Sequence, residues 1–204
     1  MKKILLPLFV SLLALVGCND TSTPKEGVQY TTVATPITST TAPVMEVFSL
    51  ACGHCRNMDK ILPEIQKLAD TDIEQVHVTF NESAQLGAYI FYTAAIQSNG
   101  HPKPELMEQL FAYTQDKPEG ATEEDRKAQL VAIFNQHSLL SPYEISEEQH
   151  KQVFKEMAKA EQVVTNAEIA SVPAFVVKGK YLVQSDAHES LEDLANTIKY
   201  LSQL

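Results

Sequence analysis

Basic residues and cysteines are scarce in this sequence, and tryptophan is absent. The 16 Lys and Arg residues stand against 26 Asp and Glu residues, which gives a formal net charge of −10. Because phosphate binding is carried mainly by Lys and Arg, this balance argues against a nucleic-acid surface. The absence of tryptophan leaves other apolar residues to line any binding groove. With 204 residues and no visible repeat, the chain predicts one elaborated domain whose partners are proteins or small molecules.

Three cysteines are present, namely Cys18, Cys52 and Cys55. A secreted scaffold stabilised by disulfides would use several pairs at wide spacing. Cys52 and Cys55 would close almost no loop, so a bond between them would remove little entropy from the unfolded chain. A structural zinc site would need two further ligands at similar spacing, and no second pair exists. Chemistry is therefore the favoured role of this pair, and we expect no metal; half a zinc site or two inert buried cysteines are the alternatives.

The N-terminus has the pattern of an export signal. Lys2 and Lys3 precede an apolar stretch over residues 4–16, which is too short for an ordinary membrane-spanning helix. The stretch leads into Gly17-Cys18, and this ending resembles the lipobox of bacterial lipoproteins, in which the cysteine is acylated and becomes the mature N-terminus. We expect lipidation at Cys18 and a periplasmic protein anchored to a bacterial membrane. An ordinary signal peptide or core segment that happens to contain a cysteine is the alternative.

Short apolar or alternating runs predict five strands, at residues 29–33, 44–50, 74–80, 174–177 and 181–183. The run at 44–50 is almost continuously apolar, as in a strand buried on both faces. The chain is therefore expected to form an α/β domain.

Helical spacing of apolar residues follows the second strand directly, from Met58 to Leu68. Residues 82–164 are rich in Ala, Leu, Gln and Glu and predict a helical block, with capping boxes at Thr122-x-x-Asp125 and Ser146-x-x-Gln149. A closing helix is expected over residues 188–201. We expect the aromatic and Met side chains of the block to form its core, namely Phe91, Phe111, Phe134, Phe154 and Met157.

The run Cys52-Gly53-His54-Cys55 lies where a buried strand gives way to a helix. The unpaired N–H groups and the positive dipole end at a helix N-terminus favour a thiolate over a thiol. The thiolate is the attacking species in disulfide exchange, so we expect Cys52 to be the nucleophile and Cys55 the resolving partner. His54 can add a positive charge or an N–H donor beside the same anion. Stabilising the thiolate stabilises the reduced pair, and about 1.4 kcal/mol of such stabilisation raises the reduction potential by about 30 mV.

Other candidate residues carry weaker signals. Glu46 interrupts the apolar run six residues before Cys52, where a lone charged carboxylate would be costly unless it protonates or simply faces solvent at an edge. The Val172-Pro173 bond precedes a predicted strand and can be cis at little cost, although most such bonds are trans. Five histidines read as ordinary surface or helix-face residues, namely His77, His101, His137, His150 and His188.

The sequence after residue 27 resembles the DsbA family of thioredoxin-fold disulfide oxidoreductases. The resemblance is carried by Glu46-Val47-Phe48-Ser49, Cys52-Gly53-His54-Cys55, His77-Val78-Thr79-Phe80 and Ser171-Val172-Pro173-Ala174-Phe175, in the family's order and spacing. It implies a thioredoxin fold with an inserted α-helical domain, a cis bond before Pro173 that faces the dithiol, and a buried acid at Glu46 that assists proton movement from Cys55. Val172 and Pro173 would then contact substrate.

With this resemblance the chain divides into five parts. They are a lipoprotein signal peptide (1–17), a lipid-anchored tether (18–27), the first part of a thioredoxin domain (28–81), a helical insertion (82–164) and the second part of the thioredoxin domain (165–204).

The expected function is a disulfide oxidase that acts on unfolded exported proteins. By family analogy a quinone-coupled membrane protein would reoxidise the pair, no cofactor would be needed, and the chain would be a monomer. Gly53 stands where the family's best-known members have Pro and is similar to protein disulfide isomerase, so an isomerase or reductase remains the alternative. Asp59 falls where the family has an acid, but Gln75 replaces a familiar lysine. A non-catalytic binding lipoprotein, such as a chaperone or metallochaperone, is an alternative of another class.

Overall fold

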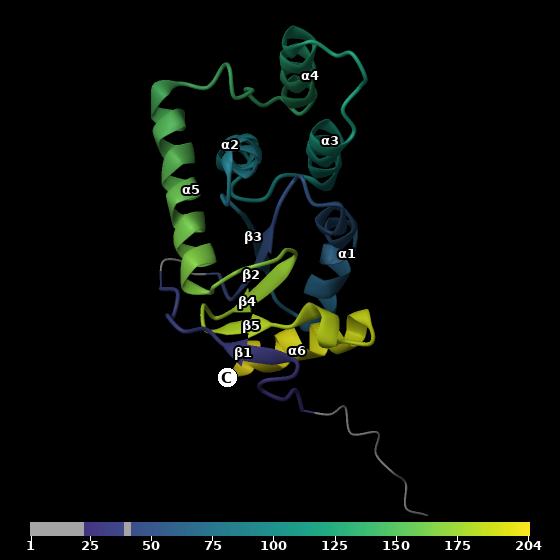
Figure 1. The fold of residues 1–204 in the computed structure, drawn as a ribbon, viewed down its shortest axis with the longest axis vertical. Coiled ribbons are helices and arrows are strands. Elements are labelled where there is room, and N and C mark those ends of the chain that lie inside the picture. The colour runs from purple at the N-terminus through teal and green to yellow at the C-terminus, as the bar shows by residue number, and fades with distance from the viewer. Residues whose placement is uncertain (1–22, 39–41) are drawn as a thin grey trace, which may run out of the picture.

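A five-stranded mixed sheet lies at the centre of the molecule (Figure 1). The computed structural model describes residues 23–38 and 42–204. The strand order is β1-β5-β4-β2-β3, and the bounds are Tyr30–Thr32 for β1, Val44–Phe48 for β2, Ile73–His77 for β3, Ala174–Val177 for β4 and Tyr181–Val183 for β5. Strands β2 and β3 run parallel, whereas the other neighbouring pairs run antiparallel. The five predicted strands are therefore confirmed, and β2 is buried at all five positions.

The third strand is shorter than the sequence predicted. It ends at His77, although Val78 N–H still donates to the Phe48 carbonyl at 2.9 Å. Asn81 then caps the next helix by accepting a hydrogen bond from Ala84 N–H, so the chain must leave the sheet within a few residues. Phe80 is consequently exposed, and its assignment to the strand was wrong.

Helices α1 (Gly53–Ala69) and α6 (Leu191–Gln203) pack together with one hydrophobic cluster of the sheet. Leu62 and Ile65 of α1 meet Ile198 of α6 in this cluster, which confirms the predicted helical spacing after β2. The closing helix begins three residues later than predicted because Ser190 is its N-cap and residues 185–187 form a short 3₁₀ turn.

Four helices separate β3 from β4 and form the helical insertion above the sheet in Figure 1. Their bounds are Glu82–Gln97 for α2, Pro104–Gln115 for α3, Glu123–Gln136 for α4 and Glu147–Asn166 for α5. Both predicted capping boxes are present, at Thr122 with Asp125 and at Ser146 with Gln149.

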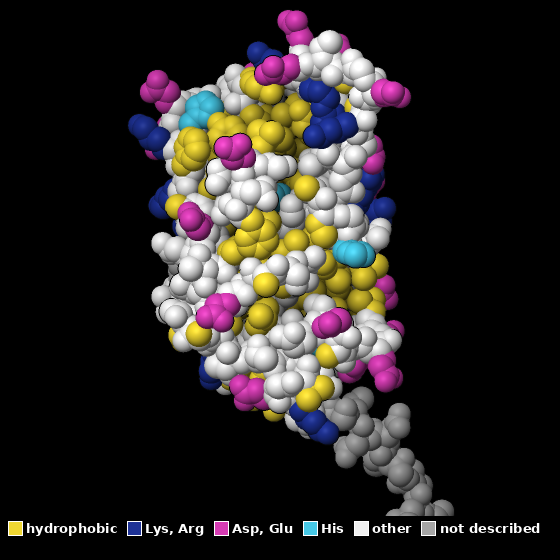
Figure 2. Space-filling model, viewed as in Figure 1, with side chains coloured by type: hydrophobic (Ala, Val, Ile, Leu, Met, Phe, Trp, Pro, Cys, Tyr) yellow, Lys and Arg dark blue, Asp and Glu magenta, His cyan; other side chains and the backbone are white. Residues whose placement is uncertain are grey.

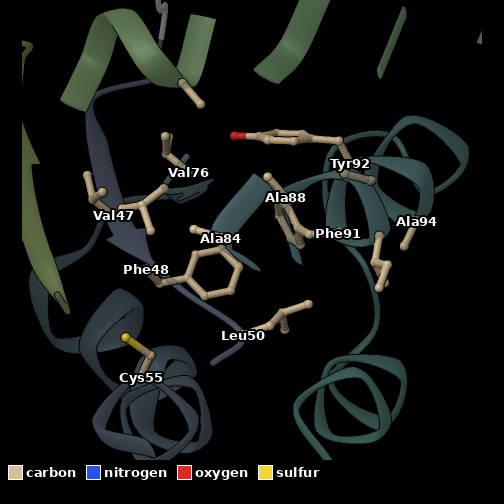
Figure 3. Close-up of a cluster of buried hydrophobic side chains, with 14 of the residues drawn as sticks. Val47, Phe48, Leu50, Cys55, Val76, Ala84, Ala88, Phe91, Tyr92 and Ala94 are labelled. Atoms are coloured by element: carbon tan, nitrogen blue, oxygen red, sulfur yellow. The ribbon is translucent and has the colours of Figure 1, made fainter. Parts of the chain in front are cut away.

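A second hydrophobic cluster joins the insertion to the sheet. Phe48, at the end of β2, lies beside α2 in the close-up of Figure 3. Its ring contacts Phe91 at a centroid distance of 4.9 Å and Phe111 at 6.0 Å, both edge-on. Leu50 and Cys55 belong to the same cluster, so the segment around the dithiol is part of the contact between sheet and insertion.

The predicted core of the insertion is confirmed in part. Phe91, Phe111 and Phe134 are fully buried, and Met157 packs against the cluster. The prediction for Phe154 was wrong: its side chain is 59% exposed, and its ring contacts that of Tyr89 at a centroid distance of 5.6 Å in a tilted arrangement. Figure 2 shows hydrophobic side chains gathered on one face of the insertion. Among the described residues, no helix is both long enough and apolar enough to cross a membrane.

The N-terminal predictions fall largely outside the described part of the chain. The proposed signal peptide and Cys18 lie wholly outside it. The end of the proposed tether is described, and there Gly27 N–H donates to the Tyr30 carbonyl at 2.7 Å while Glu26 accepts a hydrogen bond from Thr32. Ordered contacts to the domain therefore begin at least by residue 26.

Candidate active site

Cys52 is the N-cap residue of α1. Its backbone is extended, with φ −95° and ψ 116°, and its sulfur accepts a hydrogen bond from Cys55 N–H at 3.3 Å. The thiol in turn donates to the Val172 carbonyl at 3.5 Å. The side chain is half-buried, and both cysteines are free thiols. A sulfur in this position can accept N–H groups when it is an anion and can still reach a thiol or disulfide of another molecule.

Cys55 differs from Cys52 in its surroundings although the two lie one helical turn apart. It is fully buried in the cluster between sheet and insertion. Burial raises the pKa of the Cys55 thiol, and its hydrogen bond to Cys52 raises it further, with a smaller effect from Glu46. The outer sulfur is therefore the one that can exchange, whereas the inner sulfur tends to keep its proton.

Glu46 lies inside the sheet with no exposed surface. Side chains alternate along a strand, so Glu46 shares a face with Val44, which packs in the cluster of α1. Its Oε2 accepts a hydrogen bond from Gln75 Nε2 at 2.9 Å, whereas Oε1 is buried without a partner among the described residues. Burial, with Asp59 adding to it, raises the pKa of Glu46 to about 8. The alternative that Glu46 faces solvent at an edge is excluded.

Gln75 connects this buried acid to the surface. The same Nε2 atom donates to Glu46 and to Asp59 Oδ1, each at 2.9 Å. Asp59 and Gln75 line a surface pocket of about 500 Å³, and burial raises the pKa of Asp59 as well. At the place where the resemblance leads one to expect a lysine, a neutral amide thus donates to two carboxyls.

The remaining predicted residues surround Cys52. Gly53 and His54 are exposed at the start of α1, and no atom lies within 4 Å of the place where a side chain on Gly53 would begin. The Val172-Pro173 bond is cis, as the resemblance implied. His54 and Pro173 line one pocket of about 440 Å³. The structure thus brings Cys52, Cys55, His54 and the Val172-Pro173 loop together at one place.

Two residues near the dithiol escaped the sequence analysis. His77 was expected at the surface, but it is fully buried and its Nε2 accepts a hydrogen bond from Leu50 N–H at 2.9 Å. Gln115 was not singled out, and its Nε2 donates to the carbonyls of Leu50 at 2.8 Å and Cys52 at 3.2 Å. The alternation around His77 indicated a solvent-facing side chain, and nothing in the sequence around Gln115 pointed to these contacts.

Within residues 23–38 and 42–204, no group of three or more His, Cys, Asp or Glu side chains is arranged to hold a metal ion.

Known proteins share this architecture. The chain matches the thioredoxin family over residues 34–200. The thiol:disulfide interchange protein DsbA of Escherichia coli O6:H1 is 26% identical over 216 residues, which cover 100% of this chain and 99% of that protein.

Solved structures agree with this fold. The structure of DsbL from Salmonella enterica serovar Typhimurium has a TM-score of 0.69 and 20% identity, over 90% of this chain and 99% of that one. A Proteus mirabilis DsbA variant, solved with a non-covalently bound peptide, has a TM-score of 0.63 and 20% identity, over 90% and 100%. The chain belongs to the thioredoxin family and is a thiol–disulfide oxidoreductase of the DsbA type.

Proposed function

We propose that this protein introduces disulfides into unfolded exported proteins through Cys52 and Cys55. The observation that carries the proposal is the unequal setting of the two sulfurs. Cys52 caps α1 and is half-exposed, whereas Cys55 is fully buried and the pKa of its thiol is raised by burial. An acceptor for electrons from substrate needs this combination, because only one of its sulfurs should be open to attack.

The reaction begins from the oxidised pair. A substrate thiolate attacks the sulfur of Cys52, the Cys52–Cys55 bond breaks, and a mixed disulfide forms between substrate and Cys52. Cys55 leaves with the electron pair and takes up a proton. A second substrate thiolate then attacks the substrate sulfur of the mixed disulfide and releases Cys52 as a thiolate. Two electrons have passed from the substrate dithiol to the protein, and the substrate has gained one disulfide.

Glu46 is the proposed proton donor and acceptor for Cys55. Its pKa of about 8 means that it carries a proton at neutral pH yet can release it without a large penalty. Gln75 donates to Glu46 and also lines the surface pocket together with Asp59, so the buried acid lies one side chain away from this pocket. The carboxyl is thus assigned to the buried sulfur, whereas His54 is exposed two residues after the cysteine whose sulfur exchanges.

The Val172-Pro173 loop is the proposed contact for substrate. The Val172 carbonyl already accepts a hydrogen bond from the Cys52 thiol, so a peptide attached to that sulfur must run beside this loop. The Proteus mirabilis DsbA variant was solved with a non-covalently bound peptide, which supports a peptide as the substrate of this protein. His54 and Pro173 line the adjacent pocket, which offers further contacts.

We propose a periplasmic location with a lipid anchor at Cys18. The support is the sequence Leu15-Val16-Gly17-Cys18 after a short apolar stretch. Labelling with a radioactive fatty acid in a bacterial host is expected to mark the wild-type chain and not Cys18→Ser. Equal labelling of both would contradict the anchor. A quinone-coupled membrane protein is the proposed reoxidant, by analogy with the family.

The direct test is oxidation of a reduced, unfolded substrate protein by the preoxidised protein. One disulfide per protein molecule is expected for wild type, and none for Cys52→Ser or Cys55→Ser, because neither variant can form the Cys52–Cys55 bond that the substrate thiolate attacks. Lys25→Ser, away from the dithiol, serves as a control. A wild-type protein that forms no disulfide in substrate would contradict the proposal.

A disulfide isomerase is the second candidate, and it is favoured by Gly53, which stands between the cysteines as in protein disulfide isomerase. Refolding of a protein with scrambled disulfides separates the two. The isomerase reading requires the reduced protein to accelerate recovery of the native pairing, whereas the oxidase reading requires no such acceleration.

A further inference from the structure

The backbone N–H and the backbone carbonyl of Leu50, two residues before Cys52, are both hydrogen-bonded to side chains. The N–H donates to His77 Nε2 at 2.9 Å, and the carbonyl of Leu50 accepts a hydrogen bond from Gln115 Nε2 at 2.8 Å. Gln115 also donates to the Cys52 carbonyl at 3.2 Å. Neither side chain belongs to the dithiol motif or touches its sulfurs in the described structure. Both side chains instead form hydrogen bonds with the backbone of residues 50–52, the segment that leads into α1.

The hydrogen bonds of His77 fix its protonation. Since Leu50 N–H is a donor, Nε2 must accept, and the proton must therefore lie on Nδ1, which donates to the Val78 carbonyl at 2.7 Å. The ring is fully buried and lies edge-on against Phe48 at a centroid distance of 5.1 Å. A neutral ring with both nitrogens occupied has little freedom to turn, so it holds the Leu50 peptide at a fixed place.

Gly87 of α2 makes the space for this ring. A Cβ atom on Gly87 would lie 2.9 Å from His77 Nε2 and 3.0 Å from Cε1, closer than side chains tolerate. Glycine inside a helix costs about 0.5–1 kcal/mol relative to alanine, so its presence at this contact needs a reason. The backbone of α2 thus packs directly against the ring of His77. Gln115 is the last residue of α3.

Both hydrogen bonds to Leu50 therefore depend on the helical insertion. Gln115 belongs to α3, and the ring of His77 packs against Gly87 of α2. A third connection runs in parallel, because Arg56 of α1 pairs with Glu108 of α3 at 2.6 Å and with Asp116 at 2.9 Å. The insertion contacts the start of α1 through side chains that are not part of the dithiol motif.

We propose that His77 and Gln115 are positioning residues through which the helical insertion sets the reduction potential of the Cys52–Cys55 pair. They hold residues 50–52 so that Cys52 keeps the extended backbone of an N-cap, with its sulfur over the first N–H groups of α1. The helix dipole and N–H groups act only within the first turn, so a small displacement of Cys52 weakens the stabilisation of its thiolate. Loss of the hydrogen bond to His77 or to Gln115 therefore destabilises the reduced pair and lowers its reduction potential.

The proposal rests on the disulfide exchange proposed above, but not on its direction. The test is the equilibrium of the pair with reduced and oxidised glutathione, read by thiol trapping on the full-length chain. Wild type is measured first. A wild-type pair that does not exchange with glutathione contradicts the proposed function, whereas the comparison of variants below tests the positioning role alone.

Two substitutions approach the Leu50 peptide from different helices. Gln115→Met keeps the length of the side chain and removes the donor, and Gly87→Ala adds one methyl group against the ring of His77. Each is expected to lower the equilibrium constant for reduction of the pair at least threefold, which corresponds to about 14 mV. Gln109→Met, the same change elsewhere on α3, is the matched control and should match wild type.

Urea unfolding of each variant establishes that it is folded at the conditions of the redox measurement. If Gly87→Ala does not fold, His77→Gln replaces it with the same expected sign. Equilibrium constants of the folded variants within a factor of 1.5 of wild type would overturn the proposal. A change in Gln115→Met with none in the substitution at Gly87 or His77 would overturn the part assigned to His77.

Discussion

Two buried ionisable side chains lie on neighbouring parallel strands, and they differ in what surrounds them. Glu46, in β2, shares a face with the residues that pack under α1, and one of its carboxyl oxygens has no partner in the described structure. His77, at the end of β3, lies against α2, and both of its ring nitrogens are hydrogen-bonded. Neither side chain is exposed.

Burial acts on both groups but leads to different uses. It raises the pKa of Glu46 to about 8 and lowers the pKa of His77 to about 4, so both are neutral at pH 7. Glu46 titrates near neutrality and has an unpartnered oxygen, which suits proton exchange with Cys55. His77 titrates far from neutrality and is fully bonded, which suits a fixed support. The number of hydrogen bonds that each side chain makes, more than its burial, therefore distinguishes Glu46 from His77.

Removing the support should produce the largest loss of stability. His77→Ala leaves the Leu50 N–H group buried without an acceptor and opens a cavity beside Phe48. We expect the free energy of unfolding at pH 7 to fall by about 3 kcal/mol, measured by urea titration. His101→Ala, at an exposed histidine, is the control. A loss below about 1 kcal/mol would mean that the ring does not hold this peptide.

Removing the buried acid Glu46 should raise the free energy of unfolding, whereas removing His77 lowers it. The folded chain keeps a proton on Glu46 that the unfolded chain loses between pH 4.5 and about 8, so wild-type stability falls as pH rises through this window. Glu46→Gln removes that dependence. We expect it to raise the free energy of unfolding by about 2–3 kcal/mol at pH 8 and by little near pH 4.5.

The control for this substitution is Glu64→Gln, at an exposed position of α1. Glu46→Gln should also slow the exchange of Cys55 in single-turnover oxidation of a reduced peptide. A variant that is destabilised at pH 8, or that exchanges as fast as wild type, would remove the distinction drawn between Glu46 and His77.

The contribution of His77 to stability is lost as pH falls, whereas that of Glu46 is lost as pH rises. The pKa of His77 is lowered in the folded state from 6.5 to about 4, so the unfolded chain binds a proton first as pH falls. Stability that is present above pH 6.5 is therefore lost between 6.5 and 4. We expect wild type to lose about 2 kcal/mol more than His77→Gln over this range, measured by urea titration at several pH values. Parallel curves would show that His77 is not held neutral.

The smallest expected change in stability comes from a substitution in the dithiol motif itself, at Gly53. Gly53 occupies the first helical position after the N-cap, where proline is favoured, and nothing lies close to its missing side chain. Gly53→Pro is expected to raise the free energy of unfolding by about 0.4–1 kcal/mol through the unfolded state. The slopes of stability against pH that report on Glu46 and His77 should stay unchanged. A change in either slope would mean that the dithiol and the two buried groups are not separable.

The sequence predicted the strands of the sheet, a helical insertion and the cysteine at a helix start because those patterns are local. Alternation, helical spacing and capping boxes lie within a few residues of the structure that they specify. The same holds for Cys52, whose role as N-cap follows from the place where β2 ends and α1 begins.

The supports of the dithiol could not be predicted because they depend on contacts across the fold. His77 lies between two apolar residues in an alternating strand, which indicated a solvent-facing side chain, but α2 covers it and Gly87 makes the necessary space. Gln115 ends a helix in the manner of any surface glutamine, and its partners are more than 60 residues away in the chain. The prediction for Phe154 was wrong in the opposite direction, because this side chain of α5 was expected to be buried and is exposed.

The reduction potential of the Cys52–Cys55 pair tests the central claim most directly, and it is measured on the chain with Cys18→Ser against defined glutathione ratios. A dithiol whose outer thiolate is stabilised at a helix N-terminus should be oxidising, with a potential at or above about −180 mV, the value for protein disulfide isomerase. A potential near that of thioredoxin, about −270 mV, would contradict the oxidase function and make the protein a reductase that needs an electron source.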